Sequence, residues 1–107
     1  MQREKFIDGL TSGVKFTNDR RDEIIRKVVD HHGWGTVSIM SMEEMAELQQ
    51  QISKQLRGCG DQIGLLEEIA DAYICLNYLE RIFGIHPEMM QKAIDVKLLR
   101  EEGRLND

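Results

Sequence analysis

The sequence contains few of the features that mark exported or membrane proteins. It has two cysteines, Cys59 and Cys75, which lack CxxC spacing and are expected to remain reduced thiols. No apolar run reaches the ~18 residues of a membrane span, and the N-terminus has no apolar signal segment. We therefore expect a soluble, cytoplasmic protein that has no membrane partner.

Positive charge and aromatic residues are also scarce. The chain has 14 basic and 19 acidic residues, a net charge of −5, which disfavours binding to nucleic acid through phosphate contacts. Aromatic residues make up 6% of its 107 residues, so the core of a single copy is expected to be small. These features favour a homo-oligomer over a monomer.

The spacing of apolar residues predicts an all-α domain spanning residues 1–107. Residues 1–16 are expected to form an N-terminal arm, irregular or weakly helical. No strand-like alternation persists along the chain. Helices are predicted over residues 20–32, 43–56, 65–83 and 85–105. The expected fold is a bundle of about four helices that is completed by oligomerisation.

Local signals suggest where these helices begin and end. Gly33 is expected to stop the first helix, and the stretch GWGTVSIMS that starts there is interpreted as a link. Ser41 and Glu44 have the spacing of a capping box that would open the second helix. Gly64 is expected to precede the third helix, and Pro87 suits the first turn of the last.

The helix predicted over residues 65–83 contains an unexpected acid. Between Ile69 and Leu79 its only strongly polar side chains are Asp71 and Asn77. A helix that is apolar nearly all round is usually buried, and a buried carboxylate needs a partner. The partner of Asp71 is therefore the central question that the sequence raises.

Four acids at helical spacing offer an answer. Glu44 pairs with Glu47, and Glu68 with Asp71, because residues three apart lie on one side of a helix. If the two helices pack antiparallel, the four carboxylates meet and repel each other unless cations neutralise them. Such a set suits Mg²⁺, with Mn²⁺ as an alternative. The competing interpretation is two ordinary solvated pairs, with Glu44 serving only in the capping box.

The motif EExxE at Glu43–Glu47, followed after a gap of twenty residues by ExxD at Glu68–Asp71, resembles the signature of the MazG-like all-α nucleoside triphosphate pyrophosphohydrolases. The likeness is good over residues 40–78 and looser through the last helix.

The resemblance implies a particular fold, site and reaction. The fold would be a helical bundle assembled as a dimer or tetramer. Mg²⁺ would be held by the catalytic acids Glu44, Glu47, Glu68 and Asp71. The reaction would convert a nucleoside triphosphate, ribo or deoxy, to the monophosphate and pyrophosphate, a role in cleaning the nucleotide pool. One acid, Glu44 or Glu47, would act as general base.

Basic and aromatic residues give candidates for substrate binding. Lys97, Arg100 and Arg104 form one stripe on the last helix, which would either contact phosphates or be a solvated face. Lys54 follows Glu47 by two turns and is a weaker candidate. Trp34 would either stack on a nucleobase or anchor the link by packing.

Two alternative functions remain open at the level of sequence. The first is the phosphoribosyl-ATP pyrophosphohydrolase branch of the same superfamily, whose members usually carry a basic residue close before the paired acids, where this chain has Ser41 and Met42. The second is a non-catalytic helical interaction module. Retention of all four acids favours an enzyme.

Overall fold

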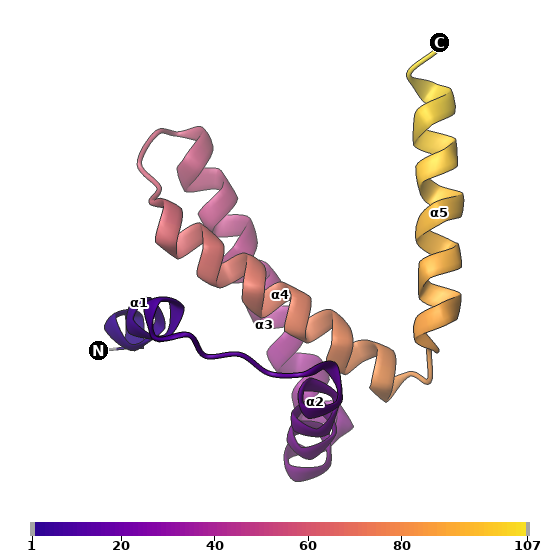
Figure 1. The fold of residues 1–107 in the computed structure, drawn as a ribbon. Coiled ribbons are helices and arrows are strands. Elements are labelled where there is room, and N and C mark those ends of the chain that lie inside the picture. The colour runs from indigo at the N-terminus through magenta and orange to yellow at the C-terminus, as the bar shows by residue number, and fades with distance from the viewer. Residues whose placement is uncertain (1, 107) are drawn as a thin grey trace.

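The computed structural model describes residues 2–106, which form helices and no strand. The helices are α1 (Gln2–Ser12), α2 (Asn18–His32), α3 (Trp34–Leu56), α4 (Gln62–Ile82) and α5 (Pro87–Arg104) (Figure 1). The all-α prediction is confirmed, and the helices number five because the expected arm contains the regular helix α1. None of the described helices is both long and apolar enough to cross a lipid bilayer.

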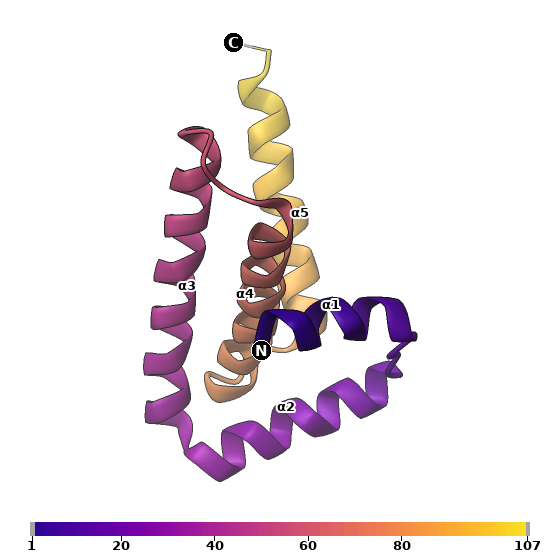
Figure 2. The same ribbon diagram turned by 90° about the vertical axis from the view of Figure 1, so that its left-hand side faces the viewer.

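The centre of the molecule is an antiparallel hairpin formed by α3 and α4 (Figure 2). Helix α2 crosses this hairpin and contacts both of its helices. Among the described residues the buried side chains are few and lie on the hairpin, at Val37, Ser41, Ala72 and Cys75. A core of this size agrees with the low aromatic content of the chain.

The corner between α2 and α3 is sharper than the sequence suggested. Gly33 ends α2 with a φ of +89°, a conformation that favours glycine, and its N–H donates to the Val29 carbonyl at 2.8 Å. The expected stop at Gly33 is confirmed. The expected link is wrong, because α3 begins at the very next residue, Trp34.

The predicted capping box is wrong for the same reason. Ser41 lies two turns inside α3, where its hydroxyl donates to the Val37 carbonyl at 2.8 Å. Val37 is completely buried. The segment around Val37 consists largely of glycine and β-branched residues, whose own helix propensity is low. Burial of the Val37 side chain on the hairpin stabilises a helical conformation along this segment.

Helix α4 also begins earlier than expected. Asp61 is its N-cap, and the Asp61 carboxylate accepts a hydrogen bond from the Gly64 N–H at 2.6 Å, so Gly64 lies within the first turn. Arg3 of α1 forms an ion pair with the same carboxylate. The pKa of Asp61 is lowered, first by the Arg3 hydrogen bond and then by the Gly64 N–H.

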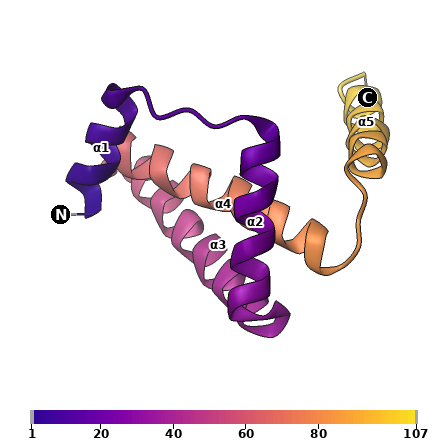
Figure 3. The same cartoon turned by 60° about the horizontal axis from the view of Figure 1, so that its bottom comes forward.

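Helix α5 projects away from the other helices (Figure 1, Figure 3). Pro87 occupies its first turn as predicted, and the His86 side chain accepts from the Glu88 N–H at 3.2 Å. Every residue of α5 except Met90 is exposed. Among the described helices, α2, α3 and α4 pack on one another. A single chain therefore does not form the expected bundle, and its completion by oligomerisation remains a prediction.

Candidate metal centre

The hairpin brings three of the four predicted acids together. Glu44 lies on α3, whereas Glu68 and Asp71 lie one turn apart on α4. One carboxylate oxygen from each lies within 4.8 Å of the others, and all three side chains are half-buried. The spacing of three residues and the antiparallel packing thus produce the convergence that the sequence predicted.

A pocket of about 160 Å³ adjoins this acid trio. Glu44 and Asp71 form its polar wall, and the thiol of Cys75 and the ring of Tyr78 follow along α4. The pocket is lined by Met40, Ser41, Glu44, Asp71, Ile74, Cys75 and Tyr78. Its lining is apolar apart from the acids, the thiol and two hydroxyl groups.

This environment disfavours negative charge on Glu44. Burial raises the pKa of Glu44 to about 7, and the nearby charges of Asp71 and Glu47 add to the effect. Burial also raises the pKa of Glu68, with Glu47 and Asp71 as further causes. Glu44 therefore holds a proton readily near neutral pH unless another positive charge replaces it.

Glu68 gives an independent indication of a missing partner. Its Oε2 atom is buried, and it has no hydrogen-bond partner among the described residues. A buried carboxylate oxygen without a partner costs free energy, because water has been removed and nothing replaces it. A hard divalent cation bound by oxygen ligands would remove this cost, so the residues fit such an ion.

Glu47 lies beside the trio but is not part of it. Its side chain is exposed, and it is absent from the group of converging carboxylate oxygens. Its charge is nevertheless close enough to raise the pKa of both Glu44 and Glu68. The structure therefore separates one acid from the three that converge.

Trp34 and Lys54 lie far from the trio along the same helix. Each is ten residues from Glu44, in opposite directions, which corresponds to about 15 Å along an α-helix. The Trp34 side chain is 67% exposed and so is not the packing anchor that one interpretation expected. Lys54 contributes to lowering the pKa of Asp61, which places it near the start of α4.

Lys97 and Arg100 are not brought to the trio within one chain. Both are exposed on α5, which extends away from the hairpin (Figure 1). Arg104, the third residue of this stripe, forms an ion pair with Glu101 of the same helix. The acids and the predicted phosphate-binding residues thus occupy separate parts of the chain.

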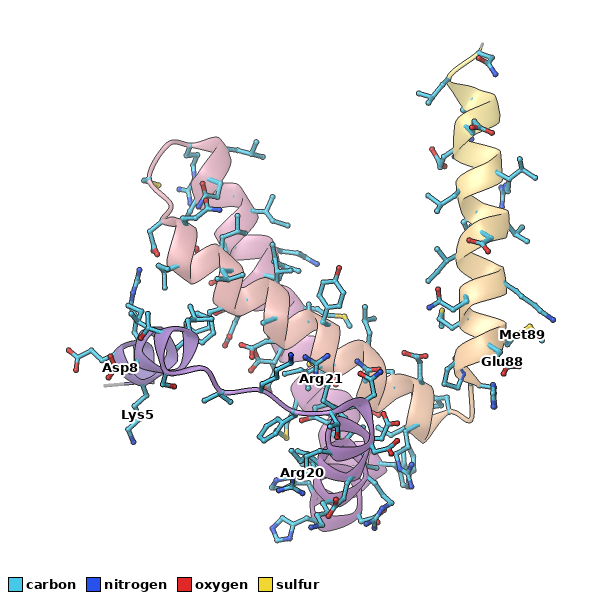
Figure 4. All side chains as sticks on the ribbon, in the orientation of Figure 1. Lys5, Asp8, Arg20, Arg21, Glu88 and Met89 are labelled. Carbon is cyan, nitrogen blue, oxygen red and sulfur yellow. The ribbon has the colours of Figure 1, made fainter. Side chains whose placement is uncertain are left out.

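A larger hollow of about 610 Å³ lies along α2 and is a poorer candidate site. Its lining comes from α2 alone, so it is the open side of one helix. Several of its charges already have partners on that helix: Lys27 pairs with Glu23 at 2.8 Å, and Arg26 with Asp30 at 3.4 Å. Arg20, which lies on α2 (Figure 4), also pairs with Glu23, at 3.3 Å.

Sequence reasoning missed part of the pocket. Ser41 and Met40 were assigned to a link, although Ser41 precedes Glu44 by three residues and therefore shares its side of a helix. Cys75 and Tyr78 were recognisable, because they continue the line of Glu68 and Asp71. Asn77, the other strongly polar side chain of this stretch, donates to the Tyr73 carbonyl at 2.9 Å on the exposed side of α4.

Comparison of the chain with protein-family models, with curated proteins and with solved structures finds no match.

Proposed function

We propose that this chain is a Mg²⁺-dependent nucleoside triphosphate pyrophosphohydrolase. The observation that carries the proposal is the convergence of Glu44, Glu68 and Asp71, whose carboxylate oxygens lie within 4.8 Å of one another. The buried, unpartnered Oε2 atom of Glu68 supports a cation at this point. The EExxE and ExxD motifs that contain these acids supply the likeness to MazG-like enzymes.

The donor set favours a hard metal ion. The converging ligands are carboxylate oxygens, which suit Mg²⁺ or Mn²⁺. Cys75 lines the adjacent pocket, but burial raises the pKa of its thiol, which disfavours the thiolate that a softer metal would bind. Bound Mg²⁺ would offset the charge of the substrate phosphates and lower the pKa of a water molecule.

The side chains around the ion would have separate tasks. Glu44, Glu68 and Asp71 would bind and orient the metal. Glu47 lies outside the trio and is exposed, so it is the acid free to accept a proton from an attacking water molecule. Ile74 lines the pocket beside the acids and would exclude bulk water.

The test is pyrophosphate release from a panel of canonical, deoxy and damaged nucleoside triphosphates with Mg²⁺. We expect turnover of at least one substrate, and its loss in Glu68→Gln. Glu43→Gln is the matched control, because Glu43 belongs to the same motif but is exposed and outside the trio. Equal activity in Glu68→Gln and the unmodified protein would show that the acid trio is not the active site.

A second candidate function has one observation in its favour. Helix α5 exposes several large apolar side chains, as an interaction module would. A module with idle acids would release no pyrophosphate from any triphosphate in the panel, and Mg²⁺ would not raise its unfolding temperature. If the chain cleaves phosphoribosyl-ATP and no triphosphate of the panel, it would instead belong to the phosphoribosyl-ATP pyrophosphohydrolase branch of the same superfamily.

A further inference from the structure

A second buried oxygen without a partner lies on the hairpin, at Gln51 of α3. Its Oε1 atom is buried and accepts no hydrogen bond from any residue between 2 and 106. Gln55, one turn further along the same side of α3, shows how such an amide is usually satisfied, because its Nε2 atom donates to the Asp61 carbonyl at 3.0 Å. Within the same residues, the other buried side-chain atom without a partner is Oε2 of Glu68, in the metal centre. Gln51 therefore needs a partner that the described chain does not supply.

The register of the antiparallel hairpin places Gln51 close to Glu68. The register is marked near the turn by the hydrogen bond to the Asp61 carbonyl, and about three turns further on by the convergence of the acid trio. Between these two contacts, Gln51 of α3 comes opposite Gly64 of α4, which precedes Glu68 by one turn. Gly64 is buried and has no side chain, so it leaves room for an amide that extends along the inside of the hairpin.

The two side chains also lean toward each other. On an α-helix a side chain leans toward the N-terminal end of its own helix. Because α3 and α4 run antiparallel (Figure 2), Gln51 leans toward the level of Glu68, and Glu68 leans back toward the level of Gln51. Burial is the main cause of the raised pKa of Glu68, and among the neighbouring charges Glu47 contributes most. Glu47 precedes Gln51 by one turn, so this effect also places Glu68 beside that part of α3.

We propose that Gln51 is a positioning residue of the metal centre. Oε2 of Glu68 binds the cation, and Oε1 of Gln51 accepts a hydrogen bond from a water molecule that the cation retains. Both atoms are acceptors, so neither can satisfy the other, whereas a hydrated cation satisfies both. Mg²⁺ usually keeps several waters when few carboxylates bind it. This inference rests on the metal centre of the proposed function.

A role through water fits the geometry of α3 better than direct binding of the ion. Gln51 follows Glu44 by seven residues, which corresponds to about 10 Å along the helix. The converging carboxylate oxygens lie within 4.8 Å of one another, so an amide that leans back by one turn reaches the edge of this group. An amide is also neutral, and it orients water without adding to the repulsion among the acids.

The test measures Mn²⁺ binding to the nucleotide-free protein by electron paramagnetic resonance. Gln51→Met keeps the length of the side chain and removes its polar atoms. We expect this variant to raise the Mn²⁺ dissociation constant on the order of 10-fold, because hydrogen bonds around a metal site contribute to its affinity. Gln50→Met is the matched control, since Gln50 is the exposed neighbour in the chain, and it should bind Mn²⁺ like the unmodified protein.

Thermal unfolding separates this role from a purely structural one. In a chelator, Gln51→Met should unfold at no lower temperature than the unmodified protein, because it removes a buried oxygen that has no partner. Added Mg²⁺ should raise the unfolding temperature of Gln51→Met less than that of the unmodified protein. A loss of stability in the chelator as large as the loss in Mg²⁺ would assign Gln51 to packing and overturn the inference.

Gln51→Glu should change the binding in the opposite direction. The new carboxylate has the same reach as the amide and adds a negative charge near the trio. We expect a lower unfolding temperature in the chelator, through repulsion, and tighter Mn²⁺ binding than in the unmodified protein. This variant also keeps the inference testable if Gln51→Met fails to fold. Mn²⁺ binding by Gln51→Glu that is no tighter than in the unmodified protein would contradict the proposed role.

Glu68→Gln separates failure of this inference from failure of the proposed metal centre. If Glu68→Gln loses Mn²⁺ binding while Gln51→Met keeps the affinity of the unmodified protein, the centre stands and the role of Gln51 is refuted. If Glu68→Gln binds Mn²⁺ as tightly as the unmodified protein, the centre is refuted and the role of Gln51 with it. Neither measurement uses a nucleotide, so both results are independent of turnover.

Discussion

The hairpin of α3 and α4 and the free helix α5 differ in what surrounds them. Both regions consist of regular, capped helix. Among the described residues, the buried side chains lie on the hairpin, which also holds three acids together, whereas all but one residue of α5 is exposed. Both regions form helices, but the acids converge only where two helices face each other.

The largest expected difference between the regions concerns activity. Asp71→Asn removes one carboxylate charge from the trio, and Asp95→Asn makes the same change on exposed α5. If the proposed reaction is correct, we expect pyrophosphate release to fall on the order of 100-fold or more in Asp71→Asn. Asp95→Asn should stay within about twofold of the unmodified protein. A folded Asp71→Asn protein with full turnover would refute the assigned role.

The second prediction concerns pH and metal. In the folded chain the pKa of Glu44 is raised from 4.5 to about 7, so between these values the folded state binds more protons than the unfolded state. The free energy of unfolding should therefore fall as pH rises from about 4.5 to 7, by roughly 2 kcal/mol after solvent screening, and then level off. Thermal unfolding in a chelator across this range measures the effect.

Metal should reverse this loss of stability. Mg²⁺ competes with protons for the trio, so it should raise the unfolding temperature more at pH 8 than at pH 5. Glu44→Gln should flatten the pH profile, whereas Glu102→Gln on α5 should leave it unchanged. If the unfolding temperature depends on neither pH nor Mg²⁺, the trio is an ordinary solvated cluster.

The third prediction compares the same substitution in the two regions. Val37 is fully buried on α3, and Val96 is 59% exposed on α5. Val37→Ala should lower the free energy of unfolding by about 2 kcal/mol, because it leaves a cavity. Val96→Ala should change it by less than about 0.5 kcal/mol. Urea denaturation of both variants provides the measurement, and equal losses would show that α5 is packed as tightly as the hairpin.

Helix caps and turns were predicted better from the sequence than the helix bounds that depend on tertiary packing. Gly33 and Pro87 act where they were expected, because caps and turns depend on neighbouring residues. Ser41 and Gly64 were misassigned as helix boundaries. Burial of Val37 and capping by Asp61 extend both helices past these signals, and neither effect can be inferred from propensity alone.

The candidate site was predictable to a similar extent. Spacing placed Glu68 and Asp71 on one side, and the short turn after α3 favoured the antiparallel packing that brings Glu44 to them. The position of Lys97 and Arg100 depends on the direction of α5, which the corner at Gly84 fixes. No periodicity in α5 itself encodes that direction, so their distance from the acids could not be foreseen.

The smallest expected difference is between the two N-caps. Asp61 caps α4 with a hydrogen bond of 2.6 Å to the Gly64 N–H, and His86 caps α5 with one of 3.2 Å to the Glu88 N–H. Asp61→Ala should lower the unfolding temperature by roughly 5 °C, because the first turn of α4 belongs to the hairpin. His86→Ala should fray the first turn of α5 and leave the unfolding temperature nearly unchanged. Amide hydrogen exchange, read residue by residue, separates local fraying from global unfolding. Asp61→Asn retains an oxygen acceptor and should keep most of the stability; a loss as large as that of Asp61→Ala would assign the effect to the ion pair with Arg3 instead of the cap.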